Sequence, residues 1–375
     1  MSEKEHQVII VGGGLAGLIS AILLKRQNID VLLIEKKSYP FHRVCGEYIS
    51  NEVRDFLGRE NLFPDSISTS NLTNFLLSDI KGATAKINLP LGGFGISRYA
   101  YDHFLYESAQ TEGVTILLET EVTDILFTDD LFKVKLKEGA VLKAKFVLGA
   151  YGKRAKLDKQ LNRAFILKRS PFIGVKYHAR LDYPGDQIGL YNFKGGYCGV
   201  SQVENGLVNI CYLSKKDNLK KYGDIKKMEE KVLYQNPLLK AIFEKAEWQF
   251  DRAEVINEIS FESKKCVENH VLMIGDTAGL ITPLCGNGMA MAIHAAKIAS
   301  DLLIDFYSND NMNREELEKK YSSKWKRVFS KRLWIGRNTQ NLFGNQSRSN
   351  LAVGLIQKFP ALGEKIILQT HGEVI

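Results

Sequence analysis

The chain has 375 residues, 45% apolar and 25% charged, which is the composition of an ordinary globular protein with one large or two interleaved domains. Its five cysteines form no CxxC pair and its seven histidines form no HExxH motif, so we expect no disulfide framework and no metal site, and we expect a reducing, cytoplasmic location. The net charge of +8 comes with no nucleic-acid module and no stacking aromatics among the lysines, so nucleic acid is not an expected partner.

The first predicted elements are a strand, a glycine turn, a helix and a second strand. Residues 8–11 and 31–34 are β-branched or leucine-rich runs, typical of buried parallel strands. Between them GGGLAG gives the pattern G-x-G-x-x-G, and the acidic Glu35 follows the second strand. This order is typical of a dinucleotide-binding unit. The polar start, MSEKEHQ, does not resemble a signal peptide, and no apolar run approaches the ~20 residues that span a bilayer.

Each residue of this loop has a physical task. Gly12 makes the tight turn, Gly14 lets the backbone approach a pyrophosphate, and Gly17 lets the helix pack against the strand. The free N–H groups at the helix start attract phosphate. Glu35 can accept hydrogen bonds from both ribose hydroxyls and repels a 2′-phosphate, which disfavours NADP here. The loop alone does not separate NAD from FAD. The other expected contacts are Leu15, Ala16 and Lys36.

Short alternating or apolar runs fill residues 166–265 and predict a mostly antiparallel sheet. Asn205-Gly206 lies between two such runs and predicts a hairpin turn. Tyr191 and Tyr197 are candidates for lining a substrate pocket, although aromatic residues at alternate strand positions are usually core. The lysine pairs of residues 214–231 are typical of a solvated helical surface; the sharper alternative is a patch for an anionic partner such as a carrier protein or a membrane surface.

A second glycine-rich helix entrance follows near residue 275. An apolar strand leads into Gly275-Asp276, then into a loop with Pro283, Gly286 and Gly288, and then into an Ala-rich helix from Met289. An NAD dehydrogenase would have little need for this unit, whereas the longer FAD molecule reaches across the fold. Asp276 is placed to bind a ribityl hydroxyl or the pyrophosphate, and a helix N-terminus beside the flavin stabilises the reduced ring. We therefore predict FAD.

These motifs resemble the FAD-dependent oxidoreductases of the p-hydroxybenzoate hydroxylase and geranylgeranyl reductase superfamily, which includes flavin-dependent halogenases. The similarity extends to about residue 305. It rests on GGGLAG with Glu35, RVCGEYIS at 43–50, a helix that begins near Arg98, TEVTDI around Val122, and GDTAGLITPLCGNGM. The resemblance implies cofactor contacts from Arg43, Arg98 and the backbone of Val122, with Cys45 either near the flavin edge or a buried filler.

The resemblance also implies the fold and its division. We expect an α/β protein with a Rossmann-like FAD-binding domain of the glutathione reductase type, built from residues 1–165 and 266–310. Residues 166–265 are expected to form an interleaved, mostly antiparallel substrate domain, with part of it inserted near 50–95. Residues 311–375 are predicted to be helices that cap the cavity or pack on the substrate sheet, with Trp325, Val328, Phe329, Leu333 and Trp334 on one apolar face.

Two departures from the superfamily pattern carry information. Tyr151 stands where an Asp usually helps to order the pyrophosphate and the nicotinamide approach, which weakens the expectation of NADPH use in the usual hydroxylase manner. The halogenase pattern W-x-W-x-I-P is absent from the sequence, which argues against halogenation.

The function expected from these features is that of an FAD-dependent oxidoreductase, with NADH or NADPH as a transient electron donor. A monooxygenase that acts on an aromatic or lipophilic small molecule of specialised metabolism is preferred because that activity is widespread. The RVCGE segment leans towards the alternative, reduction of an alkene. A non-catalytic flavoprotein that docks an anionic carrier protein and a NAD dehydrogenase are the hypotheses of other classes. The expected location is cytoplasmic, with a peripheral membrane contact as the alternative.

Overall fold

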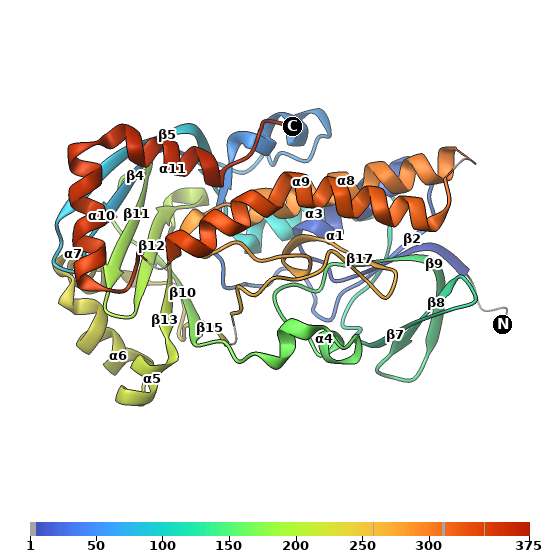
Figure 1. The fold of residues 1–375 in the computed structure, drawn as a ribbon, viewed down its shortest axis with the longest axis horizontal. Coiled ribbons are helices and arrows are strands. Elements are labelled where there is room, and N and C mark those ends of the chain that lie inside the picture. Colours follow the sequence, from blue (N-terminus) through green and yellow to red (C-terminus); the bar gives the residue numbers. More distant parts are fainter. Residues whose placement is uncertain (1–4, 258, 310–311, 341) are drawn as a thin grey trace.

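Two β-sheets organise the computed structural model, which describes residues 5–257, 259–309, 312–340 and 342–375. The first sheet is mostly parallel (Figure 1). Its strand order is β16 (Val267–Glu268), β17 (Val271–Met273), β9 (Val141–Gly149), β1 (Glu5–Val11), β2 (Val31–Ile34) and β6 (Thr115–Leu117). Strand β8 (Leu131–Leu136) also pairs with β9, and β7 (Val122–Thr128) pairs with β8. Strand β1 pairs in parallel with both β2 and β9, so it is a central strand, and its apolar residues are buried.

The second sheet is mostly antiparallel. Its strand order is β14 (Glu247–Trp248), β10 (Phe172–Arg180), β13 (Val208–Lys215), β12 (Gly196–Gln202), β11 (Gln187–Phe193), β4 (Ser70–Ser78), β5 (Thr84–Gly95) and β3 (Tyr48–Ser50), and β15 (Glu254–Asn257) also pairs with β10. Residues 48–50 and 70–95 therefore join the strands of residues 172–257 in one sheet.

Helices cover both sheets (Figure 1). Helices α1 (Leu15–Arg26), α3 (Arg98–Thr111), α8 (Gly288–Ser308) and α9 (Arg314–Gln340) lie over the first sheet, and α1 packs directly against α8. One face of the second sheet packs on α6 (Ile225–Val232) and α7 (Pro237–Lys245), beside α5 (Lys216–Tyr222). Helices α10 (Gln346–Lys358) and α11 (Pro360–Thr370) pack against β5 on the other face. The short helices are α2 (Arg54–Arg59) and α4 (Leu157–Gln160).

The alternation of side chains along β10 gives the second sheet two different faces. Val175 and Tyr177 lie in the apolar core against α6 and α7. Lys176 and His178 point the opposite way, because successive side chains of a strand alternate, and they meet the segment around Glu47. We call this second side the inner face. It lies between the second sheet and the elements of the first.

Most predicted elements are found where the sequence placed them, and the α/β fold class is confirmed. The second strand is β2, the hairpin turn at Asn205-Gly206 joins β12 to β13, and both turn residues have positive φ. The helix expected from residue 289 begins at Gly288, after a separate 3-10 turn at Pro283–Cys285. The expected boundary at 310–311 lies outside the described residues.

For one side chain of the predicted apolar face of α9, the prediction was wrong. Trp325, Phe329 and Leu333 are buried as expected, but Trp334 is 62% exposed. At ~100° per residue, Trp334 follows Leu333 onto the neighbouring flank of the helix and loses the cover that Leu333 has. In the part of the chain that the structure describes, no helix is both long enough and apolar enough to cross a membrane.

The close approach of α1 to β1 gives a first prediction. A Cβ at Gly17 would lie 2.0 Å from the carbonyl oxygen of Gly12, so Gly17→Ala forces the backbone apart. We expect this substitution to destabilise the protein by at least ~1–3 kcal/mol, which a denaturation curve measures.

Gly354 provides the matched control for this prediction. It lies inside α10 with nothing within 4 Å of its Cβ position. Gly354→Ala is expected to leave stability unchanged or to raise it by ~0.5–1 kcal/mol, because alanine loses less backbone entropy on folding. Equal destabilisation by both substitutions would contradict the close-approach role of Gly17.

Candidate active site

The first glycine loop ends in an uncapped helix. Helix α1 begins at Leu15, and its N-cap residue, Gly14, has no side chain to accept the first N–H groups. A Cβ on Gly14 would lie 3.4 Å from Nη2 of Arg98, so the glycine leaves space between the helix start and a guanidinium. Free N–H groups facing an arginine form a donor set suited to a pyrophosphate.

Glu35 lies beside this loop at the end of β2. Its carboxylate is almost fully buried and accepts hydrogen bonds from the backbone N–H of Gly13 at 2.8 Å and of Lys37 at 3.1 Å. Arg43 approaches the same carboxylate at 3.3 Å. The hydroxyl of Tyr39 donates to the carbonyl of Gly13, at 2.5 Å. The turn, the acid and the segment after β2 are thus held together.

Arg98 is fixed by a carboxylate one helical turn further along α3. Its Nε and Nη2 atoms lie 2.7 Å from the two oxygens of Asp102, which also accepts from Nε of Arg43 at 3.1 Å. Burial alone would lower the pKa of Arg98, but the charge of Asp102 and its hydrogen bonds outweigh burial and raise the pKa. The two arginines predicted as cofactor contacts therefore share one buried acid, which fixes their orientation.

The second glycine turn packs directly on the first helix. Gly275 has a φ of +58°, and a Cβ there would lie 3.3 Å from Ala16 on α1 and 3.6 Å from Ala292 on α8. The backbone carbonyl of Asp276 accepts a hydrogen bond from Nζ of Lys264 at 2.8 Å. Burial lowers the pKa of Lys264 to about 8. Both glycine-rich turns predicted as cofactor contacts therefore lie at one junction, between α1 and α8.

The entrance of α8 is held by a buried acid from another part of the chain. The amide of Asn287 donates to Glu52 at 3.0 Å, and Arg332 on α9 donates to the same carboxylate at 2.8 Å. The loop is close to the ring of Tyr48, because a Cβ on Gly286 would lie 3.0 Å from it. Met289, in the first turn of α8, is buried.

Glu47 anchors the segment RVCGE between the two sheets. It is fully buried and its φ is +55°, a left-handed conformation that is unusual for glutamate. Its carboxylate pairs with Nζ of Lys176, accepts a hydrogen bond from Nε2 of His178 at 2.6 Å, and accepts the backbone N–H of Arg98 at 2.8 Å. Burial would raise the pKa of Glu47, but Lys176 and His178 lower it to about 2. The acid is ionised at neutral pH.

This anchoring places Cys45 against the inner face of the second sheet. The carbonyl of Cys45 accepts the amide of Asn209 on β13 at 3.2 Å, and the carbonyl of Val44 accepts Nζ of Lys153 at 3.0 Å. Burial and the nearby sulfur of Cys45 raise the pKa of Cys211, the next inner-face residue on β13, to about 12. Cys45 itself is half-buried.

The two tyrosine candidates lie on opposite faces of the second sheet. Tyr191 belongs to the core against α6 and α7, and its hydroxyl lies 3.1 Å from that of Tyr183. Tyr197 lies on the inner face, where its hydroxyl accepts the backbone N–H of Leu284 at 2.9 Å. Only Tyr197 therefore contacts the loop that leads into α8.

A cavity of about 320 Å³ opens beside the same loop, large enough for part of a small molecule. Thr282 lines it from the loop, Arg337 and Gln340 line it from α9, and Phe172 and Ile259 provide apolar wall. Lys168 pairs with Glu262, another residue of the lining, at 2.9 Å, so Arg169 and Arg337 provide the excess positive charge of the cavity. The lining suits a molecule with an apolar body and an anionic end.

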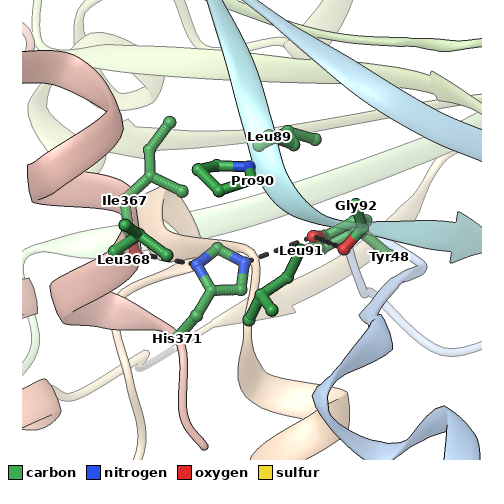
Figure 2. A pocket seen from close by; sticks show the side chains of 8 residues that line it. All are labelled: Tyr48, Leu89, Pro90, Leu91, Gly92, Ile367, Leu368 and His371. Atoms are coloured by element: carbon green, nitrogen blue, oxygen red, sulfur yellow. Dashed lines mark hydrogen bonds between the residues drawn. The ribbon is translucent and has the colours of Figure 1, made fainter. Parts of the chain in front are cut away.

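A second, smaller pocket lies at the other side of Tyr48 (Figure 2). Leu89 and Pro90 of β5 form one wall, and Ile367 and Leu368 of α11 form the other. His371 closes the space: its Nε2 lies 3.2 Å from the hydroxyl of Tyr48 and its Nδ1 lies 2.8 Å from the carbonyl of Ile367. The wall is apolar except for this contact.

The structure also places the remaining residues of the sequence analysis. Val122 is buried at the start of β7, two residues after Thr120, whose N–H donates to the carbonyl of Glu35. Tyr151, which replaces the usual Asp, points to the sulfur of Met273 at 3.5 Å. Lys36 is exposed beside Glu35.

Several polar residues of the site were missed by the sequence analysis. They are Tyr39, Asp102, Lys153, Lys176, His178 and Lys264. Asp102 carries a local signal, since it lies four residues after Arg98 on the predicted helix. Lys176 and His178 carry another, because two alternate polar residues interrupt the apolar run FIGVKYHARL.

An uncapped helix beside a paired arginine, a buried acid at the end of β2 and a second glycine turn at the same junction define a dinucleotide-binding flavoenzyme. The chain belongs to the FAD binding domain family, which residues 5–332 match. It is an FAD-dependent oxidoreductase of the p-hydroxybenzoate hydroxylase and geranylgeranyl reductase superfamily, and FAD is its cofactor, as the motifs predicted.

Individual relatives are distant but cover nearly the whole chain. A digeranylgeranylglycerophospholipid reductase of Methanosarcina acetivorans is 24% identical over 92% of this chain and 86% of its own length. A geranylgeranyl bacteriochlorophyll reductase-like protein of Thermoplasma acidophilum superposes with a TM-score of 0.78 at 18% identity, covering 98% of this chain and 96% of its own. Pseudomonas aeruginosa PqsL, solved in complex with 2-aminobenzoylacetate, superposes with a TM-score of 0.76 at 17% identity, covering 92% of this chain and 98% of its own.

Flavin occupancy tests the two glycine turns. We expect Gly14→Val to lose the yellow cofactor, because the valine side chain fills the space between α1 and Arg98. Asp276→Ala is expected to do the same by removing the acid at the second turn. The flavin-to-protein absorbance ratio of the purified variants is the measurement. Asp301→Ala, an exposed acid of α8, is the control and should keep the flavin; full occupancy in Gly14→Val or Asp276→Ala would contradict the assigned roles.

Glu47→Gln tests the anchor of residues 43–47. The substitution leaves Lys176 buried without a counter-ion, which costs about 3–5 kcal/mol of unfolding free energy at pH 7. Adding Lys176→Met should restore part of that loss. Because the folded protein lowers the pKa of Glu47, the ionised carboxylate contributes to the free energy of unfolding at any pH above its ordinary pKa of about 4.5. The wild type should lose this contribution as the pH falls from about 4.5 to 2. Identical acid denaturation of wild type and Glu47→Gln would contradict the anchor.

Proposed function

We propose that this flavoenzyme saturates carbon–carbon double bonds in an amphipathic, lipophilic substrate with an anionic end. The observation that carries the proposal is the anchored segment Arg43–Glu47, which resembles the reductase branch and is fixed against the inner face by the buried Glu47. The curated relatives named as digeranylgeranylglycerophospholipid reductases support the same reaction class.

We further propose the division of labour between the two halves. Residues 1–165 and 266–310 would hold the cofactor, residues 166–265 with the inserted strands near 50–95 would form the substrate half, and residues 311–375 would close the cavity. Adenine ribose would bind Glu35, the pyrophosphate would bind the start of α1 and Arg98, and the ring would lie by the start of α8. NADH or NADPH would serve as a transient donor.

Saturation of one double bond takes one hydride and one proton. FAD, when bound and reduced, supplies the hydride. The chain's own residues would orient the substrate and donate the proton. The proposed proton donors are Lys176 and His178, whose side-chain nitrogen atoms the ionised Glu47 fixes within the buried site. The pKa of the neighbouring His42 is lowered to about 4, mainly by burial and also by the nearby Lys176 and His178. His42 is therefore neutral at physiological pH.

The cavity beside Thr282 suits the proposed substrate. Phe172 and Ile259 would contact its apolar body, and Arg169 and Arg337 would face its anionic end. A monooxygenase acting on an aromatic or lipophilic molecule is the second candidate. The polar residues in the lining of this cavity favour it, because they suit a substrate with polar groups better than a pure hydrocarbon.

Anaerobic turnover distinguishes the two reactions. We expect dithionite-reduced enzyme, mixed without oxygen with a geranylgeranyl phospholipid, to regain its oxidised flavin spectrum while the lipid gains two hydrogen atoms per double bond. Arg337→Gln should raise KM about tenfold or more with little change in kcat, since it weakens a charge-assisted contact worth about 1.5–3 kcal/mol. Substrate-dependent oxygen uptake with insertion of an oxygen atom would instead support the monooxygenase. No re-oxidation by either route would support a non-catalytic flavoprotein.

A further inference from the structure

Helices α10 and α11 present a row of exposed apolar side chains on the side away from the second sheet. Val353 of α10 and Gly363 of α11 are buried, and a Cβ on Gly363 would lie 2.7 Å from Ile87 of β5. At ~100° per residue, Leu351 and Leu355 lie about 160° and 200° around the helix from Val353, so they point outwards. Leu351 is 62% exposed and Phe359, in the turn between the helices, is 60% exposed.

The charged residues among these side chains are nearly all basic. Arg348 and Lys358 flank the two leucines on the outer side of α10, and Lys365 lies on the outer side of α11. Glu364, the single acid between residues 346 and 370, is half-buried and contacts Asn88 of β5 instead. No aspartate or glutamate occurs between residues 319 and 363, a stretch that holds ten lysines and arginines. The outer side is therefore both apolar and cationic.

We propose that the outer side of α10 and α11 docks on an anionic lipid surface. Amphipathic helices that lie in a bilayer interface carry leucine and phenylalanine on the side that enters the headgroup region, with lysine and arginine beside them to bind anionic headgroups. A second copy of the chain fits less well, because a two-fold contact would place Lys358 and Lys365 against like charges. An acidic protein fits the charge, but its acidic side chains would leave the exposed Leu351 and Phe359 without apolar partners.

The outer side is continuous with the small pocket of Figure 2. Leu368 is 45% exposed and also lines that pocket, with Ile367 beside it. His371 and Tyr48 close the inner end, and the ring of Tyr48 touches the loop at Gly286. One layer of side chains thus separates the docking surface from the entrance of α8. This inference goes beyond the reaction proposed above, because lipid binding requires no turnover.

Vesicle co-sedimentation of the flavin-loaded protein tests the proposal. We expect binding to vesicles of phosphatidylcholine mixed with phosphatidylglycerol to exceed binding to phosphatidylcholine alone by tenfold or more, and to weaken with salt. Arg348→Glu with Lys358→Glu and Lys365→Glu should lower binding about 100-fold, since each basic residue near an anionic surface contributes roughly fivefold. Leu351→Glu with Phe359→Glu should lower it at least tenfold.

Leu126→Glu is the matched control, since Leu126 is 55% exposed on β7, far from α10 (Figure 1). It should bind vesicles as the wild type does. Flavin content and melting temperature verify that each variant is folded. The proposal is overturned if the wild-type protein does not bind vesicles that contain phosphatidylglycerol, or if the α10 and α11 variants bind them as well as the wild type does. It is also overturned if Leu351→Glu with Phe359→Glu instead dissociates a dimer or releases an acidic carrier protein. An inactive enzyme that still binds vesicles would overturn only the proposed reaction.

Discussion

The carboxylate of Glu47 is the contact on which the relation between the two sheets depends. It comes from the segment after the first βαβ unit, yet its partners Lys176 and His178 belong to a strand of the second sheet, and its third donor is the backbone of Arg98. A buried charge is stable only when it is paired and hydrogen-bonded, so the partners cannot separate without a large desolvation cost. The left-handed backbone of Glu47 is tolerated because these contacts over-determine it.

The same contact orders the cofactor side. Arg98 donates its N–H to Glu47 while its guanidinium is held by Asp102, which also holds Arg43. The two cationic side chains near the glycine turns are thus fixed before any ligand arrives, and such preorganisation lowers the entropic cost of binding. Apolar contacts join the two sheets at one end, where Ile49 and Phe94 of the second sheet lie in the core of the first. The polar contacts of Glu47 add a second connection, to strand β10 on the inner face.

The parts of this structure that local chemistry determines could be predicted from the sequence. The strand at residues 31–34, the turn at Asn205-Gly206 and the two glycine-rich helix entrances each follow from residues adjacent in the chain. The partners of Glu47 could not be predicted, because they lie about 130 residues away and their pairing depends on how the two sheets pack. The prediction that Trp334 is buried was wrong for a related reason. Helical periodicity defines an apolar face, but it does not determine how much of that face the neighbouring elements cover.

The pairing of Glu52 with Arg332 bears on the electrostatics of α8. Glu52 is a buried anion within hydrogen-bonding distance of Asn287, at the positive end of that helix. An unpaired anion there would cancel much of the helix dipole. Arg332, delivered from α9, neutralises it, and the N–H of Gly372 adds a further donor. The positive end of α8 therefore keeps its partial charge although a carboxylate lies beside it, and this balance depends on a residue more than forty positions further along the chain.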